Sequence, residues 1–180
     1  MSLNRDRLYV ALYARSGPSK MPGLEDTYHW ALIVGPKVEP EEGVGLGMRF
    51  HVREKLSVSD FEWVYDEDRI DLYPTGMLLC RVIIGKVEDV GRLRDIFQRT
   101  PVRAARPGWN CVEWVKEAVE SAIRDSHALE TNVESWGLVR DAAMWYVAEK
   151  KVAHRFDGTV PFDNRKAATW NLLEGFEQTP

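Results

Sequence analysis

The chain has 180 residues, of which 44% are hydrophobic and 29% charged, and its formal net charge is −4. This size and composition are typical of one globular domain with a single core, and the acidic balance argues against nucleic acid as a partner. We predict a single domain over residues 1–180, with its core at about 7–150 and a C-terminal extension, residues 151–180, packed on the body.

Two further features of the composition limit the class of protein. Cys80 and Cys111 are too few for a disulfide framework or a four-cysteine zinc site, so we expect no metal and no cofactor. Residues 1–7 are polar and residues 8–14 are too short to cross a membrane. The sequence therefore predicts a cytoplasmic protein with no integral membrane segment and with reduced thiols.

The first half of the chain has the patterns of β-strands. Alternating or continuously apolar runs predict strands at residues 7–15, 27–35, 48–55, 61–65 and 78–86. Proline and glycine predict loops at residues 16–23 and 37–47. The acidic stretch at residues 62–71 is predicted to be largely a solvated loop.

Helical periodicity dominates the second half. Apolar residues at helical spacing predict amphipathic helices at residues 87–99, 110–124 and 133–151, and a short terminal helix is expected near 167–173. Strands followed by helices predict an α+β fold, in which an antiparallel sheet is covered on one side by helices.

Cys111 stands where the second of these helices begins. Asn110 is a favoured N-cap residue, and Pro107 and Gly108 cannot continue the helix backwards. Amides of the first helical turn stabilise a thiolate, so we expect the pKa of Cys111 to lie below the ordinary value of about 8.5. The same amides could donate to an oxyanion.

A nucleophilic thiol needs a base, and two histidines precede the cysteine. His29 begins the strand at residues 27–35 and shares its face with Ala31 and Ile33. We predict that it is the base, and that His51, on the polar side of the strand at 48–55, orients its ring. The competing interpretations are a buried structural cysteine and histidines with no chemical role.

Aromatic residues flank both predicted catalytic positions. Trp30 follows His29, and Trp109 comes two residues before Cys111. We predict that both indoles and Asn110 contact substrate, the indoles as an apolar wall for an acyl or aromatic group. Packing in the core is the alternative for the indoles, and helix capping alone is the alternative for Asn110.

The segments at residues 28–35 (YHWALIVG), 50–52 (FHV) and 110–115 (NCVEWV) resemble the circularly permuted branch of the NlpC/P60 papain-like superfamily. The likeness is greatest to the lecithin-retinol acyltransferase-like group, in which a His-Trp-Ala strand precedes an Asn-Cys helix start. Trp114 stands where that group usually has phenylalanine. The resemblance implies a papain-like fold and a triad in which Cys111 is the nucleophile, His29 the base and His51 the orienting residue.

These observations together predict a cysteine-dependent hydrolase or acyltransferase. It would act on an amide, ester or thioester of a small-molecule, peptide or acyl substrate, through an acyl-enzyme intermediate. Whether water or another nucleophile completes the reaction is left open by the sequence. The alternative is a non-catalytic papain-like domain that binds a small molecule or a protein.

Overall fold

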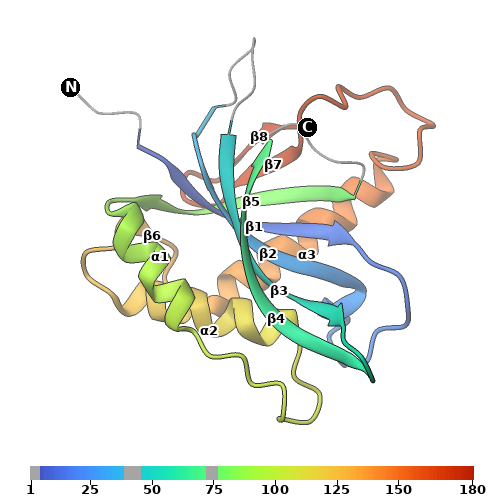
Figure 1. Cartoon of the computed structure of the whole chain (residues 1–180). Coiled ribbons are helices and arrows are strands. Elements are labelled where there is room, and N and C mark those ends of the chain that lie inside the picture. The colour runs from blue at the N-terminus through green and yellow to red at the C-terminus, as the bar shows by residue number, and fades with distance from the viewer. Residues whose placement is uncertain (1–4, 39–45, 72–76) are drawn as a thin grey trace.

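The computed structural model of the chain describes residues 5–38, 46–71 and 77–180. Its centre is an eight-stranded, mostly antiparallel open sheet with the order β4-β3-β2-β1-β5-β7-β8, in which β6 also pairs with β5 (Figure 1). The strands are β1 Arg7–Ala14, β2 Tyr28–Gly35, β3 Leu46–Leu56, β4 Phe61–Asp71, β5 Leu78–Val87, β6 Leu129–Asn132, β7 Ala168–Asn171 and β8 Phe176–Thr179. Among these ladders, only β5–β7 is parallel.

Helices of the described residues pack on one face of this sheet (Figure 1). They are α1 Val90–Arg99, α2 Cys111–Arg124 and α3 Trp136–Val152, and a 3-10 turn, η1 Glu25–Thr27, precedes β2. Each α-helix begins at a side-chain N-cap, from Asp89, Asn110 and Ser135 respectively. None of the helices in the described ranges combines the length and the apolar character that a membrane span requires.

The central strands are buried on both faces. One main core joins the helices to the sheet side that carries Leu12, Trp30 and Val82. A smaller cluster on the opposite side contains Tyr9, Ala11, Tyr13, Ala31, Ile33 and Ile83. The expected α+β class and helices on one side of the sheet are thus confirmed.

Two of the expected elements were wrong. Residues 62–71 do not form a solvated loop, because β4 continues to Asp71 and pairs with β3 along its whole length. Phe61, Trp63 and Tyr65 alternate with smaller or charged residues there, a strand period that the acidic composition obscured. Residues 168–171 form β7 rather than a helix. This strand pairs in parallel with β5 and lies between β5 and β8.

The other predicted strands and helices agree with the structure to within a few residues at each end. The predicted strands at 7–15, 27–35, 48–55 and 78–86 correspond to β1, β2, β3 and β5, and the three predicted longer helices correspond to α1, α2 and α3. The sequence missed β6, which is only four residues long. The predicted loop at 37–47 lies largely outside the described residues.

The start of β2 is separated from β3. The described β2–β3 ladder contains only Leu32, Ile33 and Val34, paired with Phe50, Arg49 and Met48. The first half of β2 is held only by β1 on its other side, while β3 continues beside β4. The strands therefore diverge at the end of β2 where His29 lies, and the N-terminus of α2 approaches β2 there.

Candidate functional site

The N-terminus of α2 is formed as the sequence predicts. The Oδ1 atom of Asn110 accepts hydrogen bonds from the amides of Val112 and Glu113, at 3.0 and 3.4 Å. Asn110 is therefore the N-cap, and Cys111 is the first helical residue. This arrangement fixes the thiol at the N-terminus of the helix, where the amides of Val112 and Glu113 are satisfied by the cap.

Backbone amides surround the sulfur of Cys111. Amides of Trp30 in β2, of Cys111 itself and of Val112 donate toward it and act to lower its pKa. The residue is only 4% exposed, however, and burial outweighs these contributions, so the pKa of Cys111 is raised to about 11. This direction is opposite to the one expected from the helix N-terminus alone.

His29 and His51 form a direct pair. The Nε2 atom of His29 lies 2.8 Å from Nδ1 of His51, and the two rings meet edge to face. Burial lowers the pKa of His29 to about 3 and that of His51 to about 4, with the neighbouring ring and Arg49 adding to the effect at His29. Both imidazoles are therefore neutral at pH 7, and each carries a proton on one of its two ring nitrogens.

Cys111 and the histidines approach the sheet from opposite sides. Cys111 and Trp30 belong to the core on the helix side, whereas His29 shares its face of β2 with Ala31 and Ile33 in the opposite cluster. No hydrogen bond joins the Cys111 sulfur to the His29 ring among the described residues. The link between them is through the backbone of β2, because the amide of Trp30, the residue that follows His29, lies beside the sulfur.

Arg15 is a charged residue that the sequence did not single out. It follows β1, and its guanidinium donates to the backbone oxygen of Asp26. Its positive charge lowers the pKa of both Cys111 and His29. A cation favours a thiolate, so Arg15 partly offsets the effect of burial on Cys111. A single exposed arginine after a strand gives no sequence signal of this.

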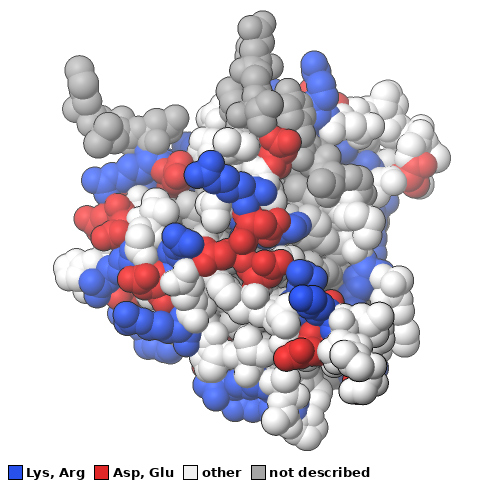
Figure 2. Space-filling model, in the orientation of Figure 1, with Lys and Arg blue, Asp and Glu red and all other residues white. Residues whose placement is uncertain are grey.

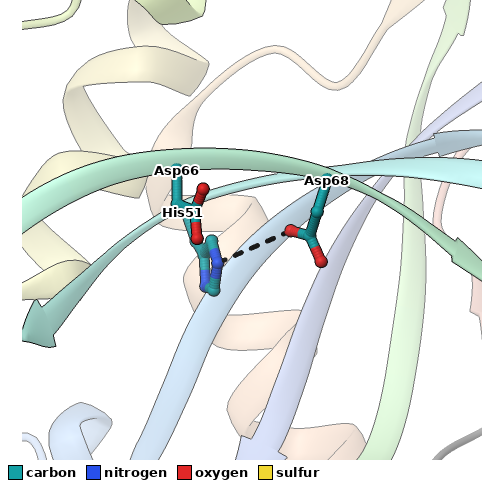
Figure 3. Close-up of side chains that lie close together, drawn as sticks. All are labelled: His51, Asp66 and Asp68. Carbon is teal, nitrogen blue, oxygen red and sulfur yellow. Dashed lines mark ion pairs between the residues drawn. The ribbon is translucent and has the colours of Figure 1, made fainter.

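A second group of polar side chains lies beside His51. Asp66 and Asp68 of β4 and His51 of β3 present ligand atoms that all lie within 4.8 Å of one another (Figure 3). These atom types could hold a divalent cation, but both carboxylates already have cationic partners. Arg53 pairs with Asp66 at 2.8 Å, and Arg49 pairs with Asp68 at 2.8 Å.

The three residues predicted to contact substrate have other contacts. The Trp30 indole is fully buried, packs against Trp136 and donates to the backbone oxygen of Glu25. Trp109 is 6% exposed and packs edge to face on Trp63. In this structure Trp30 contributes its amide rather than its indole to the surroundings of Cys111.

A surface hollow of about 300 Å³ runs along α2 and the segment that leads to it. It is lined by Arg103, Arg106, Trp109, Glu113, Lys116, Glu117, Glu120 and Arg124. The lining is charged rather than apolar, which does not match the expected acyl groove. Figure 2 likewise shows acidic and basic side chains interleaved over the face drawn there.

The buried histidines predict how stability depends on pH. Their folded-state pKa values lie below the ordinary value of 6.5, so the unfolded chain binds more protons as the pH falls. The free energy of unfolding should be highest above pH 6.5 and should fall by up to about 1.4 kcal/mol per pH unit for each histidine below it. Urea denaturation between pH 7.5 and about 4.5 measures this slope.

A matched pair of variants isolates this effect. A His29→Gln, His51→Gln double variant should show a much shallower dependence on pH, whereas replacing the exposed His127 by Gln should leave the slope unchanged. An equal slope in the wild type and the double variant would show that the two imidazoles are not buried and neutral.

The fold and the site define the protein as a single α+β domain with a buried thiol at the N-terminus of α2 and a paired His29 and His51 on the sheet. The chain belongs to a family of unknown function, DUF6914, whose model matches residues 5–179. No curated protein and no solved structure matches the chain.

Proposed function

We propose that this protein is a cysteine-dependent hydrolase or acyltransferase, acting on an amide, ester or thioester through an acyl-enzyme intermediate. Cys111 would be the nucleophile, His29 the base and His51 the residue that orients His29. The papain-like assignment of the fold belongs to the same proposal. It has the support of the sequence resemblance and of the order in which the histidines and the cysteine occur.

The observation that carries the proposal is the position of Cys111 at the N-terminus of α2, with its sulfur beside the backbone amide of Trp30, which directly follows His29 of the His29–His51 pair. The amides of Trp30, Cys111 and Val112 come from a strand and a helix end that are far apart in the sequence. Amides positioned in this way stabilise a thiolate and, during acyl transfer, a developing oxyanion. Nδ1 of His29 has no hydrogen-bond partner among the described residues, and it can accept a proton when the ring proton of His29 is on Nε2.

The proposed reaction has two halves. The thiol of Cys111 loses its proton to Nδ1 of His29 as the sulfur attacks the carbonyl carbon. The bond to the leaving group then breaks, and the proton passes from His29 to that group. Water, an alcohol or an amine next gives a proton to His29 and attacks the carbonyl carbon of the thioester. The carbon–sulfur bond breaks, and the sulfur takes the proton back from His29, which restores the thiol. His29 and Cys111 must approach within hydrogen-bond distance when substrate binds.

A non-catalytic binding domain is the competing proposal, and one observation favours it. Cys111 is 4% exposed and its pKa is raised to about 11, which is the state of an inert structural thiol rather than of an activated one. Under this proposal the same residues form a rigid polar centre, and the protein binds its ligand without chemical change.

Acylation by a generic ester separates the two proposals. The protein is incubated with p-nitrophenyl acetate, and the residue that gains an acetyl group is identified by mass spectrometry. The enzyme proposal expects a single acetyl group on Cys111 in the wild type and in Cys80→Ala, and none in Cys111→Ala. Cys80 is the matched control because it is fully buried and its pKa is raised to about 12. Absence of acetylation at Cys111 would leave the binding domain as the better proposal.

A further inference from the structure

One ring nitrogen of His51 is buried and has no hydrogen-bond partner within the described part of the chain. The side chain is 6% exposed, and its Nε2 atom is among the buried polar atoms that lack a partner. The other nitrogen, Nδ1, is used by His29. A buried imidazole nitrogen without a hydrogen-bond partner lowers the stability of the folded protein. The groups around this nitrogen therefore indicate its role.

The nearest acidic group is the carboxylate of Asp68. Its Oδ1 atom lies 3.8 Å from Nε2 of His51, along the line drawn in Figure 3. Asp68 is itself held by Arg49, whose Nη2 donates to Oδ2 at 2.8 Å and whose Nε donates to Oδ1 at 3.3 Å. The shorter bond goes to Oδ2, so Oδ1 has capacity left for a second donor.

The charge on Asp68 favours a proton on Nε2 of His51. A lone pair on Nε2 would face a carboxylate oxygen and be repelled by it, whereas an N–H at Nε2 is attracted to it. With the proton on Nε2, Nδ1 of His51 must accept the hydrogen bond from Nε2–H of His29. Nδ1 of His29 is then the unprotonated nitrogen, which is the one the proposed reaction requires.

We infer that Asp68 is a positioning residue that fixes the tautomers of both histidines and so keeps Nδ1 of His29 free to accept a proton. The inference deepens the proposed function and relies on it for its chemical meaning. The tautomers themselves can be measured whether or not the protein is an enzyme. The charge of Asp66 also acts on His51 and works to raise its pKa, but Asp66 is not assigned this role, because no ion pair joins it to His51 and its own partner is Arg53.

The alternative use of His51, Asp66 and Asp68 is to bind a divalent cation. A metal at Nε2 requires that nitrogen to be unprotonated, with Nδ1–H donating to His29. That is the reverse of the tautomer inferred from Asp68. The ion pairs of Arg49 and Arg53 with the two carboxylates also reduce the negative charge that a cation would need.

Long-range ¹H–¹⁵N correlation spectra of the ¹⁵N-labelled protein at pH 7 test the inference, because they distinguish protonated from unprotonated imidazole nitrogens. The His signals are assigned with single His→Gln variants. We expect His29 and His51 both to be protonated at Nε2 in the wild type. Asp68→Ala should abolish this single state at both rings, Asp68→Glu should retain it in part, and the matched control Asp66→Asn should retain it fully.

Acetylation by p-nitrophenyl acetate gives the second readout. Asp68→Ala should slow acetylation of Cys111 by about 10- to 100-fold, the usual effect of removing a residue that orients a functional histidine, and Asp66→Asn should change it by less than about 3-fold. If the tautomers respond to Asp68 but Cys111 is never acetylated, the tautomer assignment stands and the proposed enzyme function fails.

Two results would overturn the inference. The first is a wild-type His51 protonated at Nδ1, which needs no variant and so does not depend on whether Asp68→Ala folds. If Zn²⁺ in addition shifts the His51 signals but not those of His127, then His51, Asp66 and Asp68 form a cation site instead. The second is that both Asp68 variants keep the wild-type tautomers and the wild-type rate of Cys111 acetylation. In that case the proposed function stands, but Asp68 has no role in it.

Discussion

Replacing His29 by alanine is expected to slow acetylation of Cys111 at pH 7 by about 10²- to 10⁴-fold, the range that general-base catalysis supplies. The raised pKa of Cys111, about 11, is the physical reason. It leaves only about one thiol in 10⁴ ionised at pH 7, so almost no preformed thiolate can replace the base. The measurement is the rate of p-nitrophenolate release from p-nitrophenyl acetate by wild type and variant.

The pH profile gives this prediction a second signature. In the wild type the rate should be nearly independent of pH around neutrality, because His29 has a pKa of about 3 and is already unprotonated. In His29→Ala only the thiolate reacts, so the rate should rise about tenfold per pH unit toward the pKa of the thiol. His127→Ala, at an exposed position, is the control. Identical profiles for wild type and His29→Ala would remove His29 from the mechanism.

Replacing Trp114 by alanine is expected to cost about 3–5 kcal/mol of the free energy of unfolding, the largest effect on stability that we predict. The indole is fully buried between α2 and the sheet, where it contacts Phe97 and Tyr65. Its Nε1 atom also donates to the backbone oxygen of Thr100 at 3.3 Å. The substitution therefore leaves both a large cavity and an unsatisfied carbonyl, and denaturant unfolding at pH 7 measures the loss.

Trp145→Ala is the matched control for this loss. Trp145 is 47% exposed, although its ring packs on Trp170. Its removal should cost only about 1 kcal/mol, because much of the lost surface is already in contact with water. Equal losses in the two variants would contradict the packing of α2 on the sheet. A loss of several kcal/mol at Trp114 is a large part of the stability of an ordinary domain.

Local sequence patterns were sufficient for most of the secondary structure and for one half of the candidate site. The caps and periodicity of α2 place Cys111 at the first helical residue, as predicted from Asn110 and the residues before it. Period-two patterns likewise placed His29 and His51 on neighbouring strands. The failures were β6 and β7, which pair with β5 far away in the sequence, and the full length of β4, whose acidic composition obscured its hairpin pairing with β3.

The pKa of the thiol could not have been predicted in the right direction from sequence. A helix N-terminus is a local feature and lowers the pKa, but the burial that raises it depends on residues from strands and helices across the whole chain. The carboxylates of Asp66 and Asp68 were missed for a similar reason. An acidic run is usually solvated, and only the register between β3 and β4 brings it next to His51.

The sequence by itself determined the class of fold, the cap and position of Cys111, and the faces of the strands that carry His29 and His51. These depend on spacing along the chain and on backbone preferences that act over a few residues. Only the tertiary structure decided that the histidines contact each other, that the thiol is un-ionised and that Asp68 faces His51. Contacts and desolvation of this kind are set by strand register and packing between distant segments, which no local pattern records.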